Sequence, residues 1–267
     1  MFDTLPSEFA AALEQTALAR GHVGATIHYF AEIGSTNDEA ARLAERGAAE
    51  GTTVIASSQT AGRGRFGRTW FSPPGAGLYV SVICRDPRAA PSLSLAAGVA
   101  VAEGILAATG LPVEIKWPND IVIDAGLGRR RKLAGILAEA SSSPEGVQHV
   151  ILGFGINLRP AAYPPEIGGR ATSLETELGR EVEPGPVLAE TLAALKTCLD
   201  QLSAGNRARV LARWRELSPS SSGAAVEWHT QSGNRSGKTA GIEDDGALRV
   251  TVNGTTERII SGTLRWL

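Results

Sequence analysis

The sequence predicts a mixed α/β domain followed by a small all-β domain. Residues 1–217 alternate between apolar stretches of strand length and longer stretches rich in Ala, Leu and Glu, as in an α/β domain. A Ser-, Pro- and Gly-rich break then spans residues 218–223. Four short alternating stretches follow it, at 225–229, 238–242, 248–252 and 258–261. Because Gly and Asp separate these stretches, we expect a small β-barrel at 218–267 and a larger domain at 1–217.

Within the larger domain, helix caps and strand patterns define the expected elements. Ser7 can cap a helix over 7–20 that Gly21 ends, and Ser35 or Thr36 can cap a second helix that runs to residue 46. Further helices are expected over 93–109, 184–202 and 204–217. Strands are expected over 23–33, 52–57, 77–84, 113–116, 121–123, 132–140 and 147–158. Proline cannot donate to a strand ladder, so Pro118 should end the strand before it.

The bulk composition excludes several classes of protein. A net charge of −2 over 267 residues is too balanced for a general binder of nucleic acid or anionic membranes. The chain has two cysteines without a CxxC motif, and its four histidines lie far apart, so we expect no disulfide scaffold and no protein-bound metal. The N-terminus does not resemble a signal peptide, and no apolar run approaches the roughly 20 residues of a membrane span. We therefore expect a cytoplasmic protein.

The most informative segment is a Gly/Arg loop at residues 62–70. Its members are Gly62, Arg63, Gly64, Arg65, Phe66, Gly67, Arg68, Thr69 and Trp70. The three glycines allow the backbone to approach a ligand closely, and the three arginines offer planar donors to phosphate or carboxylate. The tryptophan can form an apolar wall or anchor the loop. The same composition would also suit a solvated basic loop or a short RNA-binding patch, although such RNA segments usually repeat and this one does not.

A second motif is the run Lys116, Trp117, Pro118, Asn119 and Asp120. A lysine at a strand end can neutralise charge that develops on a carboxylate or phosphate. The polar pair after the proline can turn toward the same ligand. Ordinary β-turn chemistry explains Pro-Asn-Asp equally well.

Two shorter motifs complete the set. The run Ser35, Thr36 and Asn37 stands at a strand-to-helix junction, where it offers either a ligand site or a plain helix cap. The GFGIN run ends at Asn157, and glycines within a strand suggest that another group approaches closely. All four motifs fall at strand ends, where α/β domains usually bind ligands. The chain lacks a P-loop, a Rossmann fingerprint after a strand and a GxSxG elbow.

Taken in order, these motifs closely resemble the biotin protein ligases. The resemblance is carried by STN at 35–37, SSQTAGRGRFGRTW at 57–70, KWPND at 116–120, RKLAGILAE at 131–139 and GFGIN at 153–157. It implies a mixed-sheet catalytic domain of the biotin/lipoate ligase type with a C-terminal SH3-like domain. It also implies a two-step reaction. Biotin and ATP, accompanied by Mg²⁺, form biotinoyl-5′-AMP and pyrophosphate, and biotin then passes to a lysine of a biotin carboxyl-carrier protein domain as AMP leaves.

The resemblance also suggests a role for particular residues. Lys116 is expected to act on the reacting carboxylate and phosphate, and Arg65 to retain the reactive adenylate. Biotin and its adenylate would contact Ser35, Thr36, Asn37, Gln59, Gly62, Arg63, Gly64, Arg65, Trp70, Lys116 and Gly135. The nucleotide would lie near Arg68, Asn119, Lys132 and Asn157.

The sequence departs from the family pattern in two places. Only 34 residues precede Ser35, too few for the DNA-binding domain of some members, so we expect no DNA binding. Ala171 stands where some members carry a tryptophan that stacks on adenine. A basic insert at 128–131 could flank the ATP site or form a solvated loop. The chain could act as a monomer or a homodimer.

Two alternatives to this function remain. A lipoate–protein ligase or octanoyltransferase would have a similar fold, but those enzymes carry a different Arg/Gly loop and no KWPND. A non-enzymatic RNA- or partner-binding module could use the Gly/Arg loop without ATP chemistry. The balanced charge and the lack of stacking aromatics in the loop disfavour this second alternative.

Overall fold

The computed structural model describes residues 2–124, 126, 130–230, 233–262 and 264–267. A seven-stranded mixed sheet forms the larger domain, and its strand order is β1-β2-β3-β7-β6-β5-β4. The strands are β1 (Ile27–Phe30), β2 (Thr53–Ala56), β3 (Gly77–Cys84), β4 (Glu114–Lys116), β5 (Asp120–Asp124), β6 (Arg130–Ser143) and β7 (Gly146–Asn157). Only the β1–β2 pair is parallel. The predicted mixed sheet is therefore confirmed.

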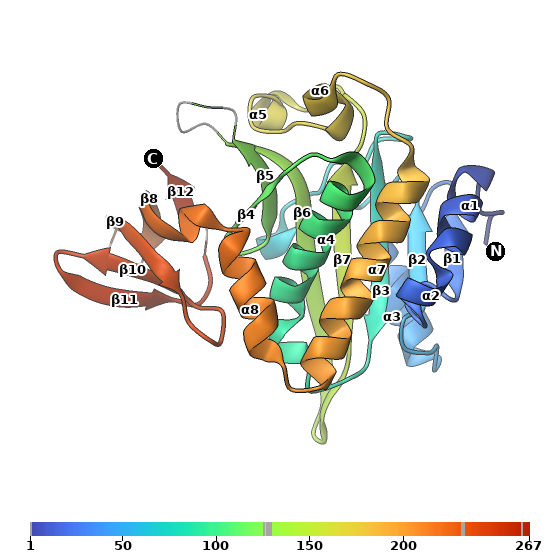
Figure 1. Ribbon diagram of the computed structural model, residues 1–267, viewed down its shortest axis with the longest axis horizontal. Helices are drawn as coiled ribbons and strands as arrows, with labels where there is room; N and C mark the ends of the chain where they lie inside the picture. Colours follow the sequence, from blue (N-terminus) through green and yellow to red (C-terminus); the bar gives the residue numbers. More distant parts are fainter. Residues whose placement is uncertain (1, 125, 127–129, 231–232, 263) are drawn as a thin grey trace.

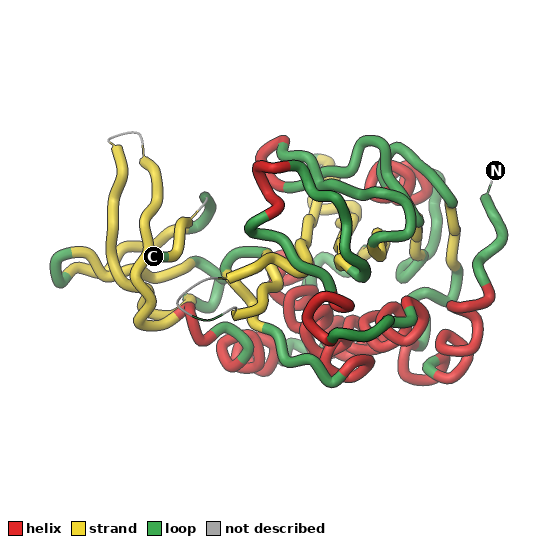
Figure 2. Tube along the Cα trace, turned by 90° about the horizontal axis from the view of Figure 1, so that it is seen from above, coloured by secondary structure: helices red, strands yellow, loops and turns green. Residues whose placement is uncertain are grey.

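Helices cover the two faces of this sheet unequally (Figures 1 and 2). The larger helical layer consists of α1 (Ser7–Gln15), α2 (Ala17–Arg20), α4 (Leu93–Thr109), α7 (Pro184–Ser203) and α8 (Arg207–Glu216). The helix α3 (Thr36–Glu45) packs with Val54, Ile83 and Ile151, whereas the next residue of each strand faces the main core. Side chains alternate along a strand, so α3 lies on the opposite face. Loops gather over that face beside α3 (Figure 2).

The helix α4 is the centre of the main core. With the turn before it, the stretch Ala90–Thr109 is long and apolar enough by composition to cross a membrane, contrary to the sequence-based expectation. However, 67% of this window is buried inside the protein. It packs most extensively against α7. We therefore assign it as a core helix.

The C-terminal residues form a separate antiparallel sheet of order β11-β10-β9-β8-β12, at the left of Figure 1. Its strands are β8 (Ser222–Thr230), β9 (Gly233–Ile242), β10 (Leu248–Val252), β11 (Thr255–Ile259) and β12 (Leu264–Trp266). The indole Nε1 of Trp117 donates to the carbonyl of Gly246 at 2.9 Å, which ties the C-terminal domain to the larger domain. The predicted all-β character is confirmed, and the boundary at 217/218 stays a prediction.

Several local expectations were wrong. The helix expected over 7–20 is interrupted at Thr16, whose hydroxyl bonds to the carbonyl of Ala12 and accepts from Arg20. Ser7 makes no side-chain cap. The helices α5 (Pro165–Gly168) and α6 (Leu174–Leu178) and the strand β12 were not expected, because each is too short to show a clear period. Cys84 and Cys198 are both buried and unpaired.

Candidate active site

A cavity of about 830 Å³ lies on the face of the sheet that carries α3. This volume is typical of a site for a small ligand. Of the predicted site residues, those that line it are Ser35, Thr36, Asn37, Gln59, Arg63, Gly64, Arg65, Arg68, Trp70, Lys116, Asn119, Lys132, Gly135 and Asn157. Gly62 does not line it. A Cβ at Gly62 would lie 2.5 Å from the carbonyl oxygen of Trp70, so this glycine instead lets the two arms of the loop approach.

The floor of the cavity is a row of residues in register across four strands. Lys116 pairs with Asp120, Asp120 with Gly135, and Gly135 with Gly155. Paired residues point to the same face, so the row places two glycines beside two charged side chains. Three strand spacings separate its ends, which gives about 14 Å between the backbones of Lys116 and Gly155. The two glycines leave the space in which Trp70 lies.

Uncharged polar side chains close one end of the cavity. Ser35 is the N-cap of α3 but makes no side-chain cap. Instead, the Oε1 atom of Gln59 accepts from the backbone N–H of Thr36 at 2.9 Å and from its hydroxyl at 3.1 Å. Ser81 donates to the hydroxyl of Thr36 and to the Oδ1 atom of Asn37, at 2.8 and 2.5 Å. The helix cap and the ligand site, which the sequence offered as alternatives, therefore involve the same group of residues.

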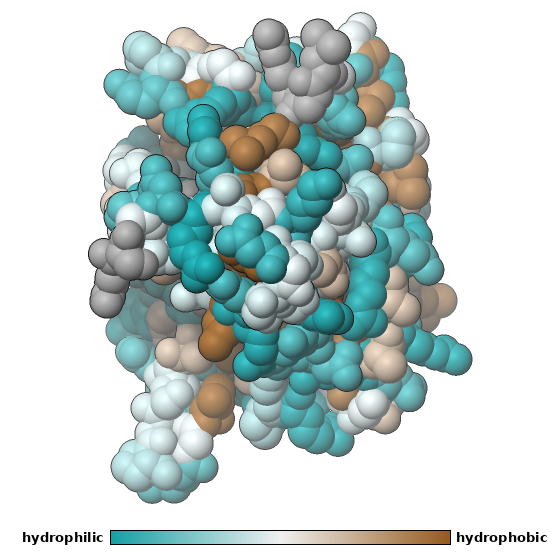
Figure 3. Space-filling view, turned by 90° about the vertical axis from the view of Figure 1, so that its left-hand side faces the viewer, coloured by the Kyte–Doolittle hydropathy of each residue, from teal (hydrophilic) through white to brown (hydrophobic). Residues whose placement is uncertain are grey.

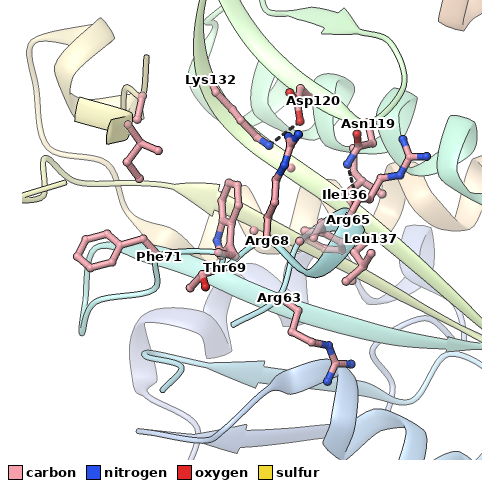
Figure 4. A pocket seen from close by; sticks show the side chains of 18 of the residues that line it. Arg63, Arg65, Arg68, Thr69, Phe71, Asn119, Asp120, Lys132, Ile136 and Leu137 are labelled. Carbon is pink, nitrogen blue, oxygen red and sulfur yellow. Dashed lines mark hydrogen bonds and ion pairs between the residues drawn. The ribbon is translucent and has the colours of Figure 1, made fainter. Parts of the chain in front are cut away.

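The Gly/Arg loop crosses the cavity, and its three arginines have different surroundings. Arg63 contacts Asp38 of α3 and Glu139 of β6, the latter at 2.9 Å, and its guanidinium points away from Lys132 and Asp120 (Figure 4). Arg65 lies on the side of Asn119, whereas Arg68 extends toward Asp120 (Figure 4). The first arginine thus anchors the loop, and the other two face the space for a ligand.

The other end of the cavity is strongly cationic. Its basic lining residues are Arg65, Arg68, Lys116, Arg130, Lys132, Arg170 and Arg265, whereas the guanidinium of Arg63 points away from this end. Asp120 is the single acidic residue among the described lining residues. The Nζ atom of Lys132 lies 2.5 Å from a carboxylate oxygen of Asp120 and 5.0 Å from the centre of the Trp70 ring. Glu114 and Glu227, which lie outside the lining, pair with Arg130 and Arg265. Asp120 alone cannot balance the remaining cations, so the cavity favours an anionic ligand.

Burial changes the acid–base properties of two predicted catalytic residues. Desolvation lowers the pKa of Lys116, and the nearby cations Lys132, Arg130 and Arg170 lower it further, whereas Asp120 opposes the shift. Desolvation also lowers the pKa of Arg65, again against the charge of Asp120. In both cases the cation is held partly out of water, where its interaction with an incoming anion is stronger.

A segment that the sequence indicated only through Ala171 borders the cationic end. Lys132 pairs with Ala171, the Lys132 N–H donates to the carbonyl of Arg170 at 2.7 Å, and the Asn157 side chain donates to the carbonyl of Thr172 at 2.8 Å. Tyr163, Ile167, Arg170 and Ala171 consequently line the cavity. Only the missing tryptophan at Ala171 pointed to this segment.

The C-terminal sheet also contributes to the cavity, through Leu264, Arg265 and Trp266. Arg130 lies over the Trp266 ring at 6.0 Å and contacts Glu114 at 3.4 Å. Residues 128 and 129 of the basic insert lie outside the described residues. Arg130, in contrast, belongs to the cavity wall and not to a solvated loop. The spacing of the motifs along the sequence did not predict that the C-terminal strand reaches this site.

Comparisons with known proteins agree with this geometry. Residues 29–157 match the model of the biotin/lipoate A/B protein ligase family. The bifunctional ligase/repressor BirA of Bacillus subtilis is 34% identical over 247 residues, which cover 91% of this chain and 74% of that protein. A biotin–[acetyl-CoA-carboxylase] ligase of Paracoccus denitrificans is 35% identical over 82% of this chain and 91% of its own length.

A solved structure shows the same architecture. The biotin protein ligase of Aquifex aeolicus in complex with biotin and ATP superposes with a TM-score of 0.78 and 28% identity. The superposition covers 91% of this chain and 100% of the other.

Proposed function

Because this chain belongs to the biotin protein ligases of the biotin/lipoate A/B protein ligase family, we propose that it activates biotin with ATP and transfers it to a carrier protein. In the first step a carboxylate oxygen of biotin attacks the α-phosphorus of ATP, and pyrophosphate leaves. In the second step a lysine amine of a biotin carboxyl-carrier domain attacks the acyl carbon of biotinoyl-5′-AMP, and AMP leaves.

The observation that best supports this proposal is the contrast between the two ends of the cavity. The uncharged amides of Asn37 and Gln59 can bond to the neutral ring of biotin through donors and acceptors. At the cationic end, Lys116 and Lys132 can neutralise the carboxylate and the phosphates. The floor of glycines between them leaves room for the reacting groups. Catalysis would therefore depend on positioning and charge, without a covalent enzyme intermediate.

Lys116 is the residue that we assign to the reacting centre. Its pair partner Asp120 is held by Lys132 at 2.5 Å, so Lys116 can direct its ammonium group to the ligand. Arg65, on the loop above, would retain the adenylate until the acceptor arrives. Trp70 would form the wall over Gly135 and Gly155.

Magnesium would enter with ATP as part of the substrate. The described part of the chain contains no group of three His, Cys, Asp or Glu residues that could hold a metal. Asp120 is the one described carboxylate in the cavity wall, and phosphate oxygens and water would supply the remaining ligands. We keep the absence of a resident metal as a prediction, together with the cytoplasmic location, the absence of DNA binding and the monomeric or dimeric state.

Biotin-dependent exchange between ATP and pyrophosphate tests the first step directly. The purified protein should catalyse this exchange, and its absence would refute the proposal in favour of a binding module. The same exchange is then measured with lipoate or octanoate in place of biotin. Exchange with either of these, and not with biotin, would favour the alternative of a lipoate–protein ligase or octanoyltransferase.

The variant Lys116→Ala should lose most of the exchange and keep its circular dichroism spectrum. Lys238→Ala, at an exposed position of the C-terminal sheet, is the matched control. Near-normal exchange in Lys116→Ala would remove Lys116 from its catalytic role.

A further inference from the structure

Polar groups are arranged differently on the surface and beside the cavity. Over the face seen in Figure 3, hydrophobic residues occur in small groups separated by hydrophilic ones, so this face offers a partner no broad apolar surface. Beside the cavity, three polar side chains from distant parts of the chain join into one network. Glu139 of β6 lies at its centre and contacts Asn37 of α3 and Arg63 of the Gly/Arg loop. We call these three residues the Glu139 network.

The side-chain amide of Asn37, a residue that is only 5% exposed, is enclosed on three sides. Its Nδ2 atom donates to the Oε2 atom of Glu139 at 2.6 Å, and its Oδ1 atom accepts from the hydroxyl of Ser81 at 2.5 Å. A Cβ at Gly153 would lie 2.2 Å from that Oδ1 atom, so this glycine leaves the space for the amide. An ionised carboxylate accepts hydrogen bonds and cannot donate them, so Glu139 decides which end of the amide faces it. The second N–H of the amide can then bond to a ligand in the cavity that Asn37 lines.

The same carboxylate holds the start of the Gly/Arg loop. The Nη2 atom of Arg63 donates to both oxygens of Glu139, at 2.9 and 3.2 Å, and its Nη1 atom contacts Asp38. An exposed ion pair contributes little by itself, and 39% of the Arg63 side chain is exposed. The Oε2 atom of Glu139, however, accepts from the loop and from the nearly buried amide at once. Loss of this one carboxylate would therefore release both groups.

Glu139 acts from outside the cavity. Asn37 and Arg63 line the cavity, whereas Glu139 does not. Leu137, two residues earlier in β6, also lines it. Residues two apart in a strand point to the same face, so Glu139 lies on the face of the cavity and just beyond its wall. It can influence a ligand only through the two residues that it holds.

We propose that Glu139 is a positioning residue that couples the biotin end of the cavity, where Asn37 lies, to the Gly/Arg loop. This inference rests on the function proposed above. The ring carbonyl of biotin would accept from the second N–H of Asn37, in the orientation that Glu139 imposes. Because the same carboxylate holds Arg63, occupation of the biotin end and anchoring of the loop would favour each other.

Two variants remove different parts of the network. Glu139→Ala removes both contacts. Glu139→Gln keeps the size of the side chain, but its amide turns an N–H group toward one of the two donors. Glu257→Ala is the matched control, because Glu257 lies outside the cavity wall and pairs with an arginine, Arg235, at 2.5 Å. The arginine and glutamate side chains are 39% and 31% exposed in this control pair, and 39% and 42% exposed for Arg63 and Glu139.

Calorimetric titration with biotin measures the effect on the biotin end. We expect Glu139→Ala to weaken biotin binding about tenfold or more, Glu139→Gln to weaken it less, and Glu257→Ala to change it less than about twofold. The residues of the cationic end are unaltered, so the KM for ATP in biotin-dependent exchange with pyrophosphate should stay within about twofold of the wild type. Unchanged biotin affinity in Glu139→Ala would overturn the inference. So would a rise in the KM for ATP equal to the loss of biotin affinity.

Limited digestion with trypsin measures the effect on the loop, because trypsin cleaves after arginine and the loop contains three. Without biotin, cleavage within residues 62–70 should be at least about threefold faster in Glu139→Ala than in Glu257→Ala. Urea denaturation should give the two variants the same free energy of unfolding. Equal rates of cleavage in the two variants would contradict the coupling to the loop.

A mutant cycle separates positioning from a general structural role. In the background Asn37→Ala/Arg63→Ala, Glu139→Ala has nothing left to position, so it should change the KM for biotin in exchange less than about twofold. The same loss in this background as in the wild type would overturn the inference. Failure of the wild-type protein to bind biotin would instead refute the proposed function itself.

Discussion

The glycine floor of the cavity leads to a sharp prediction for Gly155→Ala. A Cβ atom at Gly155 would lie 2.4 Å from the Nε1 atom of Trp70 and 2.7 Å from Cε2. Carbon atoms in ordinary contact are about 3.5 Å apart, so the indole must retreat by roughly 1 Å. The ring also lies close to Gly135, where a Cβ would be only 2.9 Å from it, so it has little room to shift toward that strand. The indole therefore moves into the space that we assign to biotin.

The size of the effect follows from the cost of overpacking. Forcing an extra methyl group into a packed site typically costs about 1–3 kcal/mol, which corresponds to roughly 5- to 150-fold in an equilibrium constant. We expect Gly155→Ala to weaken biotin binding within this range. Calorimetric titration with biotin measures the affinity, and urea denaturation shows how much of the cost falls on folding. The loss in free energy of biotin binding and the loss in free energy of unfolding should together equal the cost of the collision.

Gly169→Ala is the control for this experiment. Gly169 has an ordinary φ of −78°, and a Cβ there would meet nothing within 4 Å. Its affinity for biotin should stay within about twofold of the wild type. The double variant Gly155→Ala/Trp70→Phe should lose less than the two single losses combined, since the smaller ring relieves the collision. Wild-type affinity and stability in Gly155→Ala would refute the assignment of Trp70 as the wall of the site.

Three further predictions concern charge, retention and packing. Because burial lowers the pKa of Lys116, the free enzyme should lose this positive charge at a lower pH than an ordinary lysine would, and kcat/KM for exchange should fall at that pH. The guanidinium of the Lys116→Arg variant stays protonated, so the activity that this variant retains should fall only at a higher pH. Arg65→Gly should release adenylate that labels bystander lysines, detected by streptavidin blotting of a mixture of carrier domain and albumin; unchanged selectivity would contradict the retention role. A Cβ at Gly104 would lie 2.3 Å from the hydroxyl oxygen of Thr191. Gly104→Ala should therefore lower the free energy of unfolding, measured by urea denaturation, by about 1–3 kcal/mol. A smaller change than in Gly169→Ala would refute tight packing of α4 on α7.

Local patterns in the sequence were sufficient for most of the fold. The long helix expected over 184–202 is α7, Pro184–Ser203, and the strand expected over 77–84 is β3. Each has enough residues for its period to be clear. At Thr16, in contrast, the backbone leaves the helical dihedrals (φ −97°, ψ 5°) between α1 and α2, and periodicity does not reveal this break.

The candidate site was predictable to the extent that its residues lie in local motifs. The Gly/Arg loop, KWPND and GFGIN could each be recognised, and the resemblance to a family placed them in one site. Glu139 shows the limit of this approach. It lies 76 residues from Arg63 along the chain, yet it accepts hydrogen bonds from Arg63 and Asn37. Only the pairing of β6 with its neighbours brings these groups together.

The register of the sheet explains why the catalytic motifs are far apart in sequence and close in space. Lys116 and Asp120 face each other across a short turn, but Gly135 and Gly155 join them only through the β5–β6 and β6–β7 pairings. A slip of one residue in β6 would turn Gly135 to the opposite face and place a larger neighbour under Trp70. The site therefore depends on the β6 register as much as on its charged residues. The spacing of the motifs contains no information on that register. Burial selects it instead, because each apolar residue must face its own core, as Ile151 and Leu152 do on the two faces of β7.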